Sequence, residues 1–148
     1  MPKILSALEF VREKAKFHSD MEYSEERSGF LMDQCKSLSP GIYFILDNED
    51  ILKVGKADGV YGLKGRMNSY RSNLSARRGK DHTVDRFFLH MTGALKNKVL
   101  QMFIYEVPVT EIISEGYVIP MNIARGLEKI LSQQAKKEGH TMLLSGQD

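Results

Sequence analysis

The sequence predicts a mixed α/β fold of the α+β type, in which helices flank a small, mostly antiparallel sheet of about three strands. Two short β-type runs, residues 42–46 and 51–55, are separated by four polar residues that are typical of a turn. A third apolar run, VLQMFIYEV at 99–107, is typical of a buried strand. Segments with a helical spacing of apolar residues lie before, between and after these runs.

Length and composition indicate one soluble globular protein. The chain has 148 residues, of which 42% are hydrophobic and 27% are charged, and this is enough for one domain with a real core. No apolar run is long enough to span a bilayer, so we expect no membrane association. The single cysteine, Cys35, excludes an intramolecular disulfide and a cysteine-rich metal site. A reducing cytoplasm is the expected setting.

The first 39 residues are predicted to form a helical extension packed on the core. Residues 3–17 have the apolar spacing of an amphipathic helix. Residues 18–39 are polar, and their apolar cluster at 30–32 fits a short second helix or an extended segment. Pro40 then breaks the chain. Residues 40–148 are predicted to form the main domain, as a single globular unit.

Within that domain, residues 42–46 and 51–55 should pair as a β-hairpin. A helix is predicted over 61–74, and a basic loop over 75–80. Residues 84–95 favour helix slightly over strand, whereas residues 110–119 are predicted to be irregular.

The final helix should begin at Pro120 or Asn122 and end at Gly139. Its spacing predicts that four apolar residues point inward: Ile123, Leu127, Ile130 and Leu131.

Positive charge is concentrated in one segment. Residues 53–80 contain eight lysines and arginines and one acid, Asp58, so this segment carries +7 in a chain of net charge +2. A local basic face on a nearly neutral protein is what binding to a phosphate backbone requires. The alternative is an ordinary solvated basic surface.

Arg66 and Tyr70 stand one helical turn apart after the predicted hairpin, which carries Tyr43 and Lys53. Phosphodiester hydrolysis needs an activated water, relief of charge on the phosphoryl oxygens and help for the leaving oxygen. The guanidinium fork of an arginine matches two phosphate oxygens. A lysine or tyrosine can act as the base, and a carboxylate can hold Mg²⁺.

This order of residues resembles the GIY-YIG nuclease family. Gly41-Ile42-Tyr43 matches the first motif, and Lys53-Val54-Gly55 occupies the second, with lysine where tyrosine is usual. Arg66 and Tyr70 match the positions on the following helix, and Glu128 resembles the metal-binding glutamate. The KVGK form is similar to the branch of the family found in phages and large DNA viruses. The resemblance covers residues 40–137.

The resemblance implies an Mg²⁺-dependent (or Mn²⁺-dependent) DNA endonuclease. Lys53, helped by Tyr43, would activate water, Arg66 and Tyr70 would hold the scissile phosphate, and Glu128 would bind the metal. Further contacts with the substrate are expected from Gly55, Lys56, Arg71, Arg77, Arg78 and Lys80.

Several alternatives remain open at this stage. Tyr43 and Tyr70 are also suited to core packing, and Lys53 to an exposed, solubilising position. Glu106, Glu111 and Glu115 compete with Glu128 if the last helix is rotated. A non-catalytic nucleic-acid-binding module is the alternative function, and the lysine in the second motif favours it. A homodimer is compatible with the sequence, in a bacterial, phage or viral cytoplasm.

Overall fold

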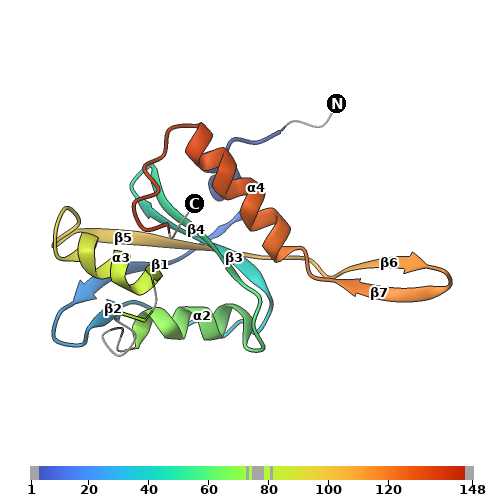
Figure 1. Cartoon of the computed structure of the whole chain (residues 1–148), viewed down its shortest axis with the longest axis horizontal. Coiled ribbons are helices and arrows are strands. Elements are labelled where there is room, and N and C mark those ends of the chain that lie inside the picture. The colour runs from blue at the N-terminus through green and yellow to red at the C-terminus, as the bar shows by residue number, and fades with distance from the viewer. Residues whose placement is uncertain (1–3, 73, 75–78, 81, 146–148) are drawn as a thin grey trace.

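A five-stranded antiparallel sheet forms the centre of the protein, with the strand order β2-β1-β5-β3-β4 (Figure 1). The computed structural model describes residues 4–72, 74, 79–80 and 82–145. The predicted α+β class, with helices flanking an antiparallel sheet, is confirmed, although the sheet has two strands more than predicted. Its strands are β1 (Lys16–Ser24), β2 (Gly29–Leu31), β3 (Gly41–Asp47), β4 (Asp50–Ala57) and β5 (Val99–Glu106).

Helices cover both faces of the sheet, so the protein has a hydrophobic core on each side. Figure 1 shows α4 over one face and α2 and α3 over the other. Helix α1 contributes Ala7 and Val11 to the core on the side covered by α4. The bounds are α1 (Ala7–Lys14), α2 (Gly62–Arg71), α3 (His82–Met91) and α4 (Ala124–Lys137).

The N-terminal 39 residues are less helical than predicted. Helix α1 is short, and Ser6 and Glu9 begin it with a reciprocal capping box. Residues 16–31 form β1 and β2, which belong to the same sheet as β3 to β5. The prediction of a helical extension is wrong there because β1 pairs along its length with β5, which lies far away in the sequence. Such long-range pairing overrides local propensity.

The predicted hairpin of residues 42–46 and 51–55 is confirmed as β3 and β4. In its register Tyr43 lies opposite Gly55, and Ile45 lies opposite Lys53. The register shifts after Ile45, so the pairs nearest the turn are offset by one residue. Because directly opposed residues share a face of the sheet, this register puts Tyr43, Lys53 and Gly55 on the side covered by α2 and α3.

Both predicted helices after the hairpin are confirmed, with shorter bounds. Leu63, Met67 and Tyr70 are the buried stripe of α2, at the helical spacing that predicted it. Helix α3 ends at Met91 and adds Phe87 and Phe88 to the same core. Most of the predicted basic loop at 75–80, including Arg77 and Arg78, lies outside the described residues.

Residues 110–121 form a second, separate sheet instead of the predicted irregular segment. Strands β6 (Thr110–Ser114) and β7 (Tyr117–Met121) pair as a hairpin that projects from the body of the molecule in Figure 1. Glu115 and Gly116 both have positive φ, of 51° and 83°, and this conformation is typical of a two-residue hairpin turn. The prediction failed because apolar residues stand on both faces of the hairpin, so the usual alternation is missing.

The last helix, α4, begins after Asn122, whose Oδ1 accepts a hydrogen bond from the backbone N–H of Ala124. Gly139, with a φ of +92°, follows the helix as predicted. Leu131 is buried, at 4% exposure, as predicted. Ile130 is 60% exposed and points outward, contrary to the prediction. The two side chains stand about 100° apart around the helix, so the sheet covers only one of them. Within the described residues, no helix combines the length and apolarity needed to cross a membrane.

The assignment of the inner face of α4 can be tested with two neighbouring substitutions. We expect Leu131→Ala to lower the free energy of unfolding by about 2–5 kcal/mol, because it leaves a cavity in the core. Ile130→Ala should change it by less than about 0.5 kcal/mol, since its side chain is mostly in water. Urea unfolding of both variants measures the difference, and equal losses would contradict this orientation of α4.

Candidate active site

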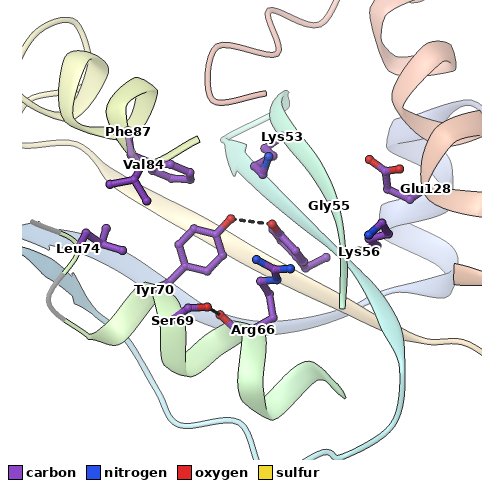
Figure 2. Close-up of a pocket in the computed structure, with 11 residues that line it drawn as sticks. Lys53, Gly55, Lys56, Arg66, Ser69, Tyr70, Leu74, Val84, Phe87 and Glu128 are labelled. Carbon is purple, nitrogen blue, oxygen red and sulfur yellow. Dashed lines mark hydrogen bonds between the residues drawn. The ribbon is translucent and has the colours of Figure 1, made fainter. Parts of the chain in front are cut away.

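A cavity of about 200 Å³ lies beside the edge strand β4, where side chains from β3, β4, α2, α3 and α4 converge (Figure 2). It brings together the five residues that the sequence predicted to be catalytic, and also Gly55 and Lys56. The lining residues are Tyr43, Lys53, Gly55, Lys56, Arg66, Ser69, Tyr70, Leu74, Val84, Phe87 and Glu128.

The two tyrosines form a hydrogen-bonded pair at the wall of the cavity. The hydroxyl oxygens of Tyr43 and Tyr70 are 2.7 Å apart, and both side chains are buried (Figure 2). Their rings meet edge to face, with centroids 5.5 Å apart, and Tyr70 also packs against Phe87. Core packing and a role in the site are therefore compatible for these tyrosines, because their rings belong to the core while their hydroxyl groups face the cavity.

Gly55 makes this arrangement possible by leaving room for the ring of Tyr43. A Cβ at position 55 would lie only 2.2–2.5 Å from three atoms at the hydroxyl end of that ring. No real side chain tolerates such a contact, so any larger residue would displace the ring. The glycine of the second motif thus has a packing role, one strand away from the side chain that it accommodates.

Two lysines enter the cavity from opposite faces of β4. Lys53 is only 8% exposed and is one of the few buried polar side chains of the described chain. It lies on the side of Tyr43, contrary to the alternative of an exposed, solubilising lysine. Lys56 stands opposite Ile42 on the side of α4, and its amine is 3.4 Å from the carboxylate of Asp58. Together they make this edge of the sheet strongly positive.

Arg66 lies on the exposed surface of α2, and its guanidinium borders the cavity. Ser69, three positions later on the same helical face, also lines the cavity. Its hydroxyl donates to the carbonyl of Arg66 at 2.8 Å. Sequence reasoning did not single out Ser69, although its spacing from Arg66 could have indicated a shared face.

Glu128 approaches from α4, on the other side of the β4 ribbon from Arg66 and Tyr70 in Figure 2. Burial raises the pKa of this carboxyl above its ordinary value, because the charged form loses water. Four nearby cations oppose the rise and favour the carboxylate, and Lys53 and Lys56 are the two strongest. For Glu128 the cost of partial burial therefore outweighs the attraction of its positive neighbours.

Among the described residues, Glu128 is the sole acid that lines the cavity, and this limits the kind of metal that the cavity suits. Among the described residues, no cluster of three or more His, Cys, Asp or Glu side chains could hold an ion. A structural zinc site needs about four protein ligands. Mg²⁺ commonly binds through one or two carboxylates and keeps waters and substrate phosphates as its other ligands. The residues therefore fit Mg²⁺ held between Glu128 and a phosphate.

Some predicted residues do not reach the cavity. Arg71 lies at the end of α2, where its Nε donates to the carbonyl of Met32 at 3.1 Å. Lys80 is exposed and does not line the cavity. The three glutamates that competed with Glu128 do not line it either, since Glu106 is at the end of β5 and Glu111 and Glu115 are on the projecting hairpin.

The close packing at position 55 predicts a clear effect of adding one methyl group. Gly55→Ala should lower the free energy of unfolding by about 1–3 kcal/mol, because the ring of Tyr43 must move, and it should break the contact between the tyrosine hydroxyl groups. Urea unfolding and near-ultraviolet circular dichroism measure the two effects. Gly126→Ala is the matched control, since open space surrounds that glycine in α4, and it should be neutral or stabilising.

The raised pKa of Glu128 predicts a stability that depends on pH. Because partial burial makes the charged form of Glu128 costly, Glu128→Gln should increase the free energy of unfolding at neutral pH. As pH falls through the raised pKa and then below about 4.3, the ordinary value for glutamate, Glu128 becomes neutral and the advantage of glutamine should disappear. Thermal unfolding from pH 3 to 8 measures this difference, and a variant that is less stable at pH 7 would contradict it.

No protein-family model matches this sequence, and no curated protein matches it. Solved structures that are similar to it include the following two. A mutant of EndoII from bacteriophage T4 has a TM-score of 0.55 and 17% sequence identity, over 87% of this chain and 94% of that chain. The restriction endonuclease HPY188I, in complex with product DNA, has a TM-score of 0.47 and 10% identity, over 93% of this chain and 88% of that chain. The first of these similarities shows that the chain shares the fold of phage T4 EndoII.

Proposed function

We propose that the protein is an Mg²⁺-dependent DNA endonuclease of the GIY-YIG type, which hydrolyses phosphodiester bonds. The observation that carries this proposal is the composition of one small cavity, in which two phenols, two amines, a guanidinium and one carboxylate converge. These groups come from segments that are far apart in the chain. The fold shared with EndoII, an endonuclease of phage T4, supports the same function.

In this proposal, Arg66 and Tyr70 hold the scissile phosphate. The guanidinium of Arg66 is at the mouth of the cavity, where its fork of N–H donors can bind two phosphoryl oxygens. The hydroxyl of Tyr70 is fixed by Tyr43, so it needs little reordering to donate to a third oxygen. Such fixed donors stabilise the charge that develops in the transition state.

Lys53 and Tyr43 are the candidates for activating water. Lys53 is buried in the cavity on the same face of the hairpin as Tyr43, so both can reach a water beside the bound phosphate. A lysine accepts a proton only as the neutral amine, and this role therefore requires Lys53 to be deprotonated in the working enzyme. Tyr43 would orient the water through its hydroxyl group.

Glu128 would hold Mg²⁺ on the opposite side of β4 from Arg66 and Tyr70. Such an ion would supply positive charge that stabilises the leaving oxygen of the phosphodiester. Glu128 must be ionised to bind the ion, so protons compete with Mg²⁺ at a higher pH than for an ordinary glutamate. Lys56 lies close enough to favour the carboxylate form.

Duplex DNA would lie over the basic edge formed by β4 and α2. Lys56 and Lys80 are proposed to contact its phosphates, together with Arg77 and Arg78 and the exposed part of Arg71. Because one such cavity cuts one strand, we propose that the protein acts as a homodimer. We place it in the cytoplasm of a bacterial, phage or viral system.

Nicking of a supercoiled plasmid with Mg²⁺ tests the function directly. Arg66→Ala and Glu128→Gln should each reduce the rate about 10²–10³-fold, which is typical for loss of one transition-state contact. Arg66→Lys should recover little, because the fork of donors is lost. Arg12→Ala is the matched control, since Arg12 is on α1 and pairs with Glu49, and it should cut like the original protein.

The outcomes separate the two functions. Equal nicking by the original protein and both site variants would contradict the assigned residues and indicate a contaminating nuclease. If all of these proteins bind DNA without Mg²⁺ and none of them nicks it, the non-catalytic nucleic-acid-binding module would be favoured. The Lys53→Met variant should bind DNA and fail to nick it if Lys53 is the base.

A further inference from the structure

Six of the exposed large hydrophobic residues of the described structure lie on the β6–β7 hairpin. All ten of its strand residues are exposed or half-buried. Ile113 is 77% exposed, and its large apolar neighbours on both strands are exposed as well. The exposed set is Ile112, Ile113, Tyr117, Val118, Ile119 and Met121.

Both faces of the hairpin are apolar. The register puts Ile112 opposite Ile119, and Thr110 opposite Met121, on one face. Ile113 lies opposite Val118 on the other. A hairpin that stood in water would carry polar residues on at least one face, and an isolated two-stranded sheet is only marginally stable. The residue pattern therefore calls for a protein partner around the hairpin.

The charge of the segment argues against nucleic acid as that partner. Residues 108–121 contain two acids, Glu111 and Glu115, and no lysine, arginine or histidine. A hairpin that enters a DNA groove or lies on an anionic bilayer needs positive charge against the phosphates. This segment would be repelled by either surface, although the basic edge around β4 would attract them.

The free edges of the hairpin point to a second copy of the same chain. Within the described residues, β6 and β7 pair only with each other, so each has one open edge. Pro120 has no backbone N–H to donate, so β7 is poorly suited to pairing with another strand at its open edge. Strand β6 contains no proline and can pair with its own copy around a two-fold axis.

Such pairing also avoids a clash of charges. If β6 meets β6 of the second copy with the axis at Ile112, each Glu111 lies opposite an Ile113 and not opposite the other Glu111. The result is a continuous four-stranded sheet, in which the backbone groups at the open edge of each β6 are paired. Edge pairing of this kind is a common route to assembly.

We propose that the β6–β7 hairpin is a dimerisation arm, and that two copies of the protein join along their β6 strands. The proposal goes beyond the endonuclease function, because the hairpin contributes nothing to the cavity. It has a consequence for that function, since the hairpin runs directly into α4, which carries Glu128. Dimerisation would thus fix the spacing of two cavities for the two strands of a duplex.

Sedimentation equilibrium of the full chain tests the association. The original protein should have about twice its monomer mass of 16.8 kDa at micromolar concentration. Ile113→Glu should weaken the dimer roughly tenfold or more, because each new carboxylate would lie opposite Glu111 of the second copy. Leu89→Glu is the matched control, since Leu89 is an exposed leucine of α3 (66%) outside the hairpin, and it should leave the mass unchanged.

Circular dichroism should show that Ile113→Glu keeps its fold, since the hairpin is outside both cores. A monomeric original protein would overturn the proposal, as would a dimer that only Leu89→Glu dissociates. Unchanged mass together with lost DNA binding in Ile113→Glu would assign the hairpin to DNA instead. None of these masses depends on nuclease activity, so failure here is distinct from failure of the proposed function.

A cysteine scan tests the edge. In a Cys35→Ser background, Ile112→Cys should form an intermolecular disulfide readily on mild oxidation, since opposed Cα atoms in an antiparallel pair are about 4.5–5.5 Å apart. Val118→Cys on β7 should not. Cross-linking through β7 alone would overturn the assignment to β6.

Discussion

The contact between the ring of Tyr43 and the bare backbone of Gly55 determines how the rest of the cavity is built. It exists only in the register that puts the two residues opposite each other in the β3–β4 hairpin. With the ring in that place, its hydroxyl meets that of Tyr70 and ties α2 to the sheet. The position of Arg66 on α2 follows from this tie. A slip of one residue would turn Tyr43 to the other face.

The cavity also concentrates charges that a purely structural protein would avoid. Lys53 is almost fully buried, and burial raises the pKa of Glu128 despite the cations around it. Partly desolvated groups of this kind are unfavourable for folding, and they are typical of sites where a ligand is bound or a proton is moved. In this protein their cost is offset by two well-packed cores, one on each face of the sheet.

The two departures from the predicted fold have a common cause. Neither β1 nor the β6–β7 hairpin has a local sequence pattern that identifies it as a strand, and β1 is held by a distant partner strand. For β1, the partner is β5, which lies far along the chain. The hairpin has apolar residues on both faces, and periodicity alone cannot distinguish such a segment from an irregular one. Only the helices and strands with a clear local sequence pattern could therefore be predicted.

The sequence by itself determined the α+β class, the β3–β4 hairpin, the helices α2 and α4, and the kinds of side chain expected in the candidate site. These features depend on short-range patterns of apolar residues, turns and charge. Only the tertiary structure decided that Glu128 reaches the cavity, that Arg71 does not, and that Ile130 faces water. Each of these depends on how a helix is rotated and where it crosses the sheet. The rotation and the crossing are set by packing against residues that are distant in the chain. The sequence pattern of a single helix carries no information about that packing.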